Sequence, residues 1–252
     1  MSTQTAPDPE LVRFYEEAEQ KYLRSLKPEH FMEAFGQGTQ RKITLESFDL
    51  VRRARPEVQC FNEMLIQYPR AGTKLGQVVP DNLVVLHPEP LQVRGSFVVE
   101  LQPARPFLVI EYVSKGSRRK DYDANLRKYE RELCVPYYLL FYPDNEELTL
   151  FRLGGDRYAS VGIISSGRQP IPELELEVAL HEGWVRYWFR GELLPLPAEL
   201  ADQRDEERAG RREAERERDA AERERDAANT RAAALEAEVA RMREEVARMR
   251  GG

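Results

Sequence analysis

The sequence predicts an α/β (α+β) fold, in which a sheet-forming domain is followed by a long charged helix. Between residues 57 and 195, short apolar segments bounded by Pro and Gly are typical of β-strands. Two helical patterns precede these segments and a third interrupts them at residues 121–133. From about Glu199 onward nearly every residue is Arg, Glu, Asp or Ala, which indicates a solvated helix.

We expect three parts along the 252 residues. Residues 1–40 form an N-terminal segment, which has helical spacing from Leu11 to Leu26 and is otherwise irregular. Residues 41–197 form the globular domain, which is long enough to bury a single core. Residues 198–250 form a charged heptad coiled coil.

The elements of the globular domain follow from local patterns. A helix is expected at residues 41–53 and ends near Pro56. Residues 69–81 contain two glycines and are expected to form a connection. The expected strands are 58–68, 82–87, 96–102, 106–114 and 135–143, then a hairpin of 147–153 and 157–164, then 173–180 and 183–197. The uninterrupted apolar run at 135–143 is typical of a strand that is covered on both faces.

The tail repeats with a period of seven residues, since AERERDA occurs at 214–220 and again at 221–227. Apolar residues then continue in two series with steps of four and three: Ala228, Leu235, Met242 and Met249, and Ala232, Val239 and Val246. Val in one series with Leu or Met in the other favours a parallel two-stranded coiled coil, so we expect a homodimer through residues 214–250. A single charged helix is the alternative, because Arg218 and Arg225 occupy seam positions.

Bulk properties limit the possible functions. The net charge of −6 means that any nucleic-acid site must be a local basic patch. The three histidines lie far apart and do not form a zinc-binding pattern. No apolar stretch approaches ~18 residues and the N-terminus does not resemble a signal peptide, so we expect no membrane span and a cytoplasmic protein.

A carboxylate interrupts the apolar strand at 106–114. Glu111 lies between Ile110 and Tyr112, and burying its charge is costly without a metal, Lys or Arg nearby. Asp81 begins an earlier strand directly after Pro80. Two acids on neighbouring strands can hold a hard divalent cation such as Mg²⁺ or Mn²⁺. Glu100 competes for the role of the second acid.

A basic cluster directly follows the Glu111 strand and consists of Lys115, Arg118, Arg119 and Lys120. Such a cluster attracts an anionic substrate. Together, the acids, a metal and the cations indicate phosphodiester hydrolysis by a metal-activated water. The competing interpretation is a turn at Asp81, a structural acid at Glu111 and an ordinary solvated loop.

Three motifs occur in a fixed order: VVPDNLVVL, PFLVIEYVS and RKDYDANLRKYERELCVPYYLLFYPDNEELTLFRL. In this order they resemble the Uma-type family of restriction endonucleases, which belongs to the PD-(D/E)XK nuclease superfamily. The resemblance covers about residues 40–195 and makes 41–197 a nuclease-like domain. It implies a mixed sheet flanked by helices, with Asp81 and Glu111 as metal ligands of a Mg²⁺-dependent endonuclease acting on DNA.

Two departures from the family pattern concern its lysine. The superfamily lysine falls at Val113 and the family's helix lysine at Asn125, and neither residue supplies a positive charge. Lys128 is the nearest replacement, about 60° around a helix and ~4.5 Å along it. We expect Lys128 to orient water or stabilise the phosphate. The family's polar residue on a preceding helix has Glu46 as a candidate, or Glu46 is a surface acid.

The alternative function is a catalytically degenerate nuclease-like fold. Such a protein is a nucleic-acid-binding or scaffold module that dimerises through its coiled coil. Asn125 at the family's lysine position is the main support for this alternative.

Overall fold

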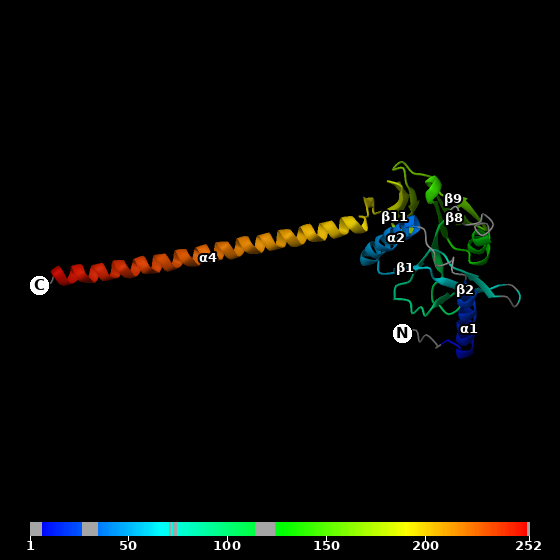
Figure 1. The fold of residues 1–252 in the computed structure, drawn as a ribbon, viewed down its shortest axis with the longest axis horizontal. Helices are drawn as coiled ribbons and strands as arrows, with labels where there is room; N and C mark the ends of the chain where they lie inside the picture. The colour runs from blue at the N-terminus through cyan, green and yellow to red at the C-terminus, as the bar shows by residue number, and fades with distance from the viewer. Residues whose placement is uncertain (1–6, 27–34, 71, 73–74, 114–123, 251–252) are drawn as a thin grey trace. The chain divides into compact units, whose positions relative to one another are not determined.

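The computed structural model describes residues 7–26, 35–70, 72, 75–113 and 124–250 (Figure 1). The chain divides into two compact units, Met1–Pro197 and Ala198–Gly252. The first unit combines helices with three sheets, and the second is a long helix, so the predicted α+β class with a C-terminal helix is confirmed.

A six-stranded sheet forms the centre of the first unit, with the strand order β1-β4-β6-β7-β8-β9. Its strands are β1 (Val58–Asn62), β4 (Asn82–Leu86), β6 (Pro106–Tyr112), β7 (Tyr137–Tyr142), β8 (Glu147–Gly154) and β9 (Arg157–Ser160). The β6–β7 pair is parallel, whereas the other four pairs are antiparallel. The sheet is therefore mixed, as expected.

Two smaller sheets accompany the central one. The first has the order β3-β2-β5 and the second the order β10-β11-β12-β13. Their strands are β2 (Leu65–Pro69), β3 (Leu75–Val78), β5 (Ser96–Val98), β10 (Gln169–Ile171), β11 (Leu176–His181), β12 (Trp184–Phe189) and β13 (Glu192–Leu193). The strand expected at 58–68 is two strands, because Glu63 has a φ of 45° and turns the chain between them.

The segment that was expected to be a glycine-containing connection includes β3. Gly76 lies in this strand because a Cβ atom there would overlap the ring of Tyr68, its partner on β2. The glycine therefore permits close packing within the sheet rather than marking a turn.

The helices are α1 (Pro9–Ser25), α2 (Phe35–Ala54) and a short π-helix, η2 (Lys128–Glu132), which follows helical residues 124–127. The described part of the first unit also contains two 3₁₀ turns, η3 (Pro143–Asn145) and η4 (Pro172–Leu174). The expectation of irregular structure up to residue 40 is wrong for residues 35–40, which are helical. The buried Gln40 side chain makes two hydrogen bonds to the backbone of Val185, of 2.8 and 3.0 Å, and these fix this end of α2 against β12.

Two hydrophobic clusters cover the two faces of the central sheet. One face packs on α2 and the β10–β13 sheet, and receives Leu108 and Ile110 from β6. The other face packs on the β2–β3–β5 sheet and η2, and receives Val109 from β6. Because side chains alternate along a strand, Glu111 belongs to the same face as Val109.

The second unit is α4 (Pro197–Arg250), a single helix of 54 residues. Four of its seam residues are exposed large apolar side chains: Leu235, Val239, Met242 and Val246. Among the helices that the structure describes, none has a stretch long and apolar enough to cross a membrane.

Candidate active site

The two predicted metal ligands lie opposite each other on neighbouring strands. β4 and β6 are antiparallel with Asn82 paired to Ile110, a register that places Asp81 across from Glu111. The backbone N–H of Tyr112 donates a hydrogen bond of 2.7 Å to Oδ2 of Asp81, which ties Asp81 to the end of β6. Both acids therefore meet where β4 begins and β6 ends.

The electrostatics of the pair reflect this proximity. Burial and, second, the negative charge of Asp81 raise the pKa of Glu111 from its ordinary 4.5 to about 8. Burial also raises the pKa of Asp81, although the Tyr112 N–H and the charge of Arg41 oppose this shift. Two carboxylates in a shielded site favour a bound proton or a bound cation, since both charges are otherwise unfavourable.

Tyr129 supports Glu111 from η2. Its hydroxyl donates a hydrogen bond of 2.6 Å to Oε1 of Glu111, and its ring is fully buried. Burial and the charge of Glu111 raise the pKa of Tyr129, so the hydroxyl stays a donor. In the sequence, Tyr129 lies among apolar residues at helical spacing and matches the tyrosine of the family's helix motif, and neither pattern shows that its hydroxyl reaches Glu111.

Arg41 is a site residue that the sequence did not single out. Its Nη2 lies 3.3 Å from Oδ1 of Asp81 and 3.0 Å from Oε1 of Glu63. The only signal in the sequence is its place in a predicted helix, and the cation reaches Asp81 because α2 packs beside the ends of β1 and β4.

A buried hydrogen-bond network holds α2 at the height of the acid pair. Thr44, one turn after Arg41, bonds to the hydroxyls of Tyr112 at 2.6 Å and Tyr187 at 2.9 Å. The Tyr112 hydroxyl also donates to Oδ1 of Asn82, the residue after Asp81, at 2.9 Å. The network therefore joins α2, β4, β6 and β12 directly beneath the site.

The other predicted residues take different positions. The Lys128 amine donates a hydrogen bond of 3.0 Å to the carbonyl of Gln77 on β3. Glu100 accepts a hydrogen bond of 2.5 Å from Tyr15 and so anchors α1. Glu46 is partly buried on α2, the same helix from which Arg41 reaches Asp81. The predicted nucleic-acid contacts Lys115, Arg118, Arg119 and Lys120 lie outside the described residues.

The donor set fits a magnesium-type ion. Within the described part of the chain, no group of three or more His, Cys, Asp or Glu residues gathers as a metal cluster. Mg²⁺ commonly keeps several waters and is held by one or two carboxylates, so a pair of acids such as Asp81 and Glu111 is compatible with this ion. Oxygen ligands alone favour Mg²⁺ or Mn²⁺ over a softer metal.

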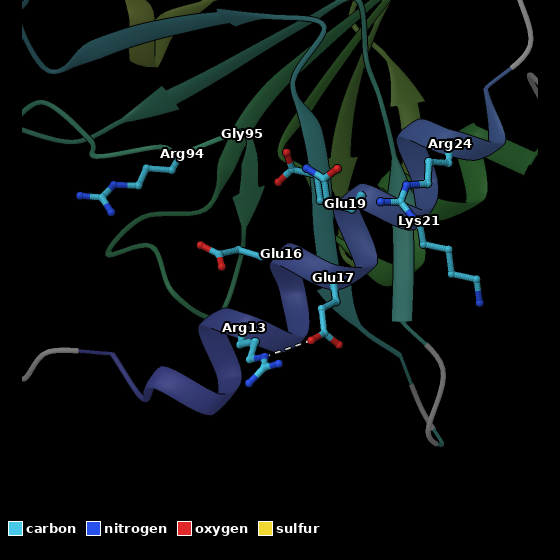
Figure 2. A pocket seen from close by; sticks show the side chains of 9 residues that line it. Arg13, Glu16, Glu17, Glu19, Lys21, Arg24, Arg94 and Gly95 are labelled. Carbon is cyan, nitrogen blue, oxygen red and sulfur yellow. Dashed lines mark hydrogen bonds and ion pairs between the residues drawn. The ribbon is translucent and has the colours of Figure 1, made fainter.

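A cavity of about 500 Å³ opens beside the pair and is lined by Asp81, Arg41 and Glu63. A wider hollow of about 800 Å³ lies along α1, where Arg13 and Glu17 form an ion pair (Figure 2). This hollow carries charged residues of both signs and neither of the two acids, so the smaller cavity is the candidate substrate site.

A family model described as "Uma2: Putative restriction endonuclease" matches residues 32–185. The chain belongs to the Uma2 family. The Uma2 match contains both acids, Arg41 and Tyr129, whereas α1 and α4 lie outside it. The sequence-based identification of this family is thereby confirmed.

No curated protein matches this Uma2 chain. Among solved structures, the chain is similar to a crystal structure described as a "putative nuclease belonging to DUF820" from Anabaena variabilis ATCC 29413. The two share 14% sequence identity with a TM-score of 0.44, over 57% of this chain and 75% of that chain.

Proposed function

We propose that this Uma2 protein is a metal-dependent endonuclease that hydrolyses phosphodiester bonds in DNA. The observation that carries the proposal is the placement of Asp81 opposite Glu111 on one face of the sheet, where burial raises both pKa values and the charge of Asp81 raises that of Glu111 further. Such a pair is poorly suited to a purely structural role, because burying two acids costs free energy that a cation offsets.

In this mechanism Asp81 and Glu111 hold Mg²⁺ or Mn²⁺. The bound ion supplies an activated water and neutralises charge on the phosphate. The Tyr112 N–H orients Asp81, and the Tyr129 hydroxyl orients Glu111, whose proton must leave before it binds a cation. Lys128 orients water or stabilises the phosphate.

The substrate side of the proposal rests on positive charge. Lys115, Arg118, Arg119 and Lys120 contact the DNA backbone, an interaction that carries no sequence information and weakens as salt rises.

We further propose that the protein acts in the cytoplasm. Cys60 and Cys134 are both free, as is usual in a reducing compartment.

The test is plasmid cleavage by the purified full chain with Mg²⁺ or Mn²⁺. We expect Glu111→Gln and Asp81→Asn each to lower the rate at least about a hundredfold, since each removes one ligand. Glu177→Gln is the matched control, because this acid of β11 pairs with Arg168 and not with the site. Cleavage that persists in both site variants contradicts the proposal. Loss with Glu111→Gln but not with Lys128→Ala contradicts only the lysine assignment.

A second candidate is a degenerate fold that binds nucleic acid or acts as a scaffold without cutting. The ion pair between Arg41 and Asp81 favours it, because the guanidinium already occupies an oxygen that a metal needs. Val113 and Asn125 at the two lysine positions point the same way. DNA binding without cleavage under any divalent cation is the outcome that selects this candidate.

We also propose a homodimer through residues 214–250. Its support is the series of exposed apolar side chains on α4, which is costly to leave in water over several turns. A parallel two-stranded coil covers this seam and joins two nuclease domains in one assembly.

A further inference from the structure

The cavity beside the acid pair is lined by ionic and by apolar side chains. Arg41 lines it together with its ion-pair partners Glu63 and Asp81. The apolar part of the lining comes mainly from α1, the residue after it and β2, through Tyr22, Leu23, Leu26 and Leu65. Its volume of about 500 Å³ lies within the usual range for a small-ligand site.

The wall that α1 contributes is held in place by polar contacts. Gln67 on β2 donates a hydrogen bond of 3.0 Å to the carbonyl of Tyr15, and the Tyr15 hydroxyl donates to Glu100. Glu19 projects from α1 towards Gly95, and a Cβ atom at Gly95 would overlap the Glu19 carboxylate (Figure 2). Since α1 precedes the residues matched by the family model, this wall is a feature of the chain beyond the matched region.

We propose that this cavity binds one unpaired nucleotide of the substrate strand, with its phosphate at Arg41 and its base against Tyr22 and Leu26. The inference rests on the proposed nuclease function and names the substrate form that the site accepts. A guanidinium pairs with a phosphate through parallel N–H donors, and a tyrosine ring offers a stacking surface to any base.

The nucleotide must be unpaired, because α1 forms a wall of the cavity. In a duplex each base is stacked between its neighbours, so it reaches a walled cavity only after it leaves the stack. Single-stranded DNA, or a duplex end or distortion, supplies such a base without the cost of unstacking.

The charge of the cavity makes nucleotide binding depend on a divalent cation. Among the residues that the structure describes, the carboxylates of Glu19, Glu63 and Asp81 line it together with one cation, Arg41. A phosphate is repelled by this excess of negative charge until a divalent ion neutralises it. The neighbouring hollow shares Glu19 and Gly95 with the cavity and carries Lys21, Arg24 and Arg94, which suits the phosphates of the continuing strand.

The experiment measures binding of a short single-stranded oligodeoxynucleotide that contains 2-aminopurine, whose fluorescence falls when the base stacks. The full chain is titrated with Ca²⁺ in place of Mg²⁺, so that binding is observed without turnover. We expect Tyr22→Ala to raise the Kd about tenfold and to remove the quenching, as for loss of one base–aromatic stack. Tyr22→Phe keeps the ring and should bind as the wild type does.

Phe14→Ala is the matched control, because Phe14 is an exposed aromatic residue of the same helix that does not line this cavity. Thermal melting of each variant verifies that the fold is intact. EDTA should abolish binding, and an intact duplex of the same sequence should compete poorly.

Equal affinity of Tyr22→Ala and the wild type overturns the inference and leaves the endonuclease proposal standing. If the quenching depends on Tyr22 but the protein never cleaves DNA, the nucleotide site is supported and the endonuclease proposal is contradicted. Absence of quenching in the wild type with Ca²⁺, or tighter binding of the duplex, also overturns the inference.

Discussion

At the residue scale, Glu111 is a half-buried carboxyl group that binds a proton more readily than an exposed one. Burial and the charge of Asp81 raise its pKa to about 8, so most of it is neutral at pH 7. Tyr129 donates to the same group and fixes its orientation. A cation at the pair displaces this proton, so metal affinity is expected to increase as the pH rises.

Glu111 therefore links stability to pH in a definite direction. Its pKa is about 8 in the folded chain and near 4.5 when unfolded, so between these values the folded state binds more protons. The free energy of unfolding contributed by Glu111 is complete below pH 4.5 and is lost as the pH rises through 8.

We predict that Glu111→Gln removes this dependence. In EDTA, the stability of the variant relative to the wild type should rise by at least about 1 kcal/mol between pH 4.5 and pH 9, equivalent to less than one pKa unit. Urea unfolding at both pH values provides the measurement. Parallel stability curves for the two proteins would mean that Glu111 is not buried as a neutral acid.

The sequence predicted the acid pair but not its surroundings. Asp81 and Glu111 stood out because each is a charge beside an apolar strand. The role of Arg41 depends on where α2 packs, which no local pattern contains. The hydroxyl of Tyr129 matters only through a contact that is formed across the fold.

At Glu63, a strained backbone conformation lowers the stability of the fold while the side chain pairs with Arg41. Glu63 occupies the left-handed region with φ 45° and accepts an ion pair from Arg41. A glycine there relieves backbone strain of roughly 1 kcal/mol but removes the carboxylate that positions the guanidinium. A gain in stability at this position therefore comes with a less ordered site.

At the scale of elements, α2 determines how the site is assembled, because it joins the central sheet to the β10–β13 sheet. Gln40 satisfies both the N–H and the carbonyl of Val185, and Thr44 satisfies two tyrosine hydroxyls. Gln40 and Thr44 lie within one helical turn of Arg41, so their contacts also fix the position of the Arg41 guanidinium.

We predict that Gln40→Ala destabilises the first unit by about 1–3 kcal/mol, because it leaves two buried backbone groups of Val185 without their partner. Urea unfolding of the full chain gives the measurement. Lys42→Ala is the matched control, since Lys42 is an exposed residue of the same helix. A similar loss in both variants would contradict the assignment to the Val185 contacts, because Ala favours a helix at either position and only Gln40 bonds to Val185.

The elements that the sequence predicted well carry strong patterns of their own. β6, β7 and the β8–β9 hairpin follow from apolar runs and from the turn at Gly154–Gly155. β3 and β10 did not, because Gly76 and Pro170 are residues that usually break strands. Packing against Tyr68 overrides the local preference at Gly76.

At the scale of the whole molecule, α4 is a separate unit with its own exposed seam. We predict that the full chain is a dimer and that deletion of residues 198–252 gives a folded monomer, since the hydrophobic clusters lie within the first unit. Light scattering measures the mass, and circular dichroism follows the fold.

Point variants of the same helix refine this prediction. Val239→Lys places a charge in the seam and should shift the full chain towards the monomer. Arg241→Ala changes an exposed neighbouring residue and should leave the dimer intact. The dimer proposal fails if the full chain and the deletion variant are both monomers, or if both form the same oligomer.

Both acid strands lie inside the central sheet, with β1 and β6 beside β4, and β4 and β7 beside β6. Amide protons of such interior strands exchange with solvent only through openings that approach global unfolding, whereas edges such as β9 open at lower cost. Fraying at the margins, under mild heat or denaturant, therefore leaves Asp81 facing Glu111. The proposed active site is therefore expected to stay assembled until the central sheet itself unfolds.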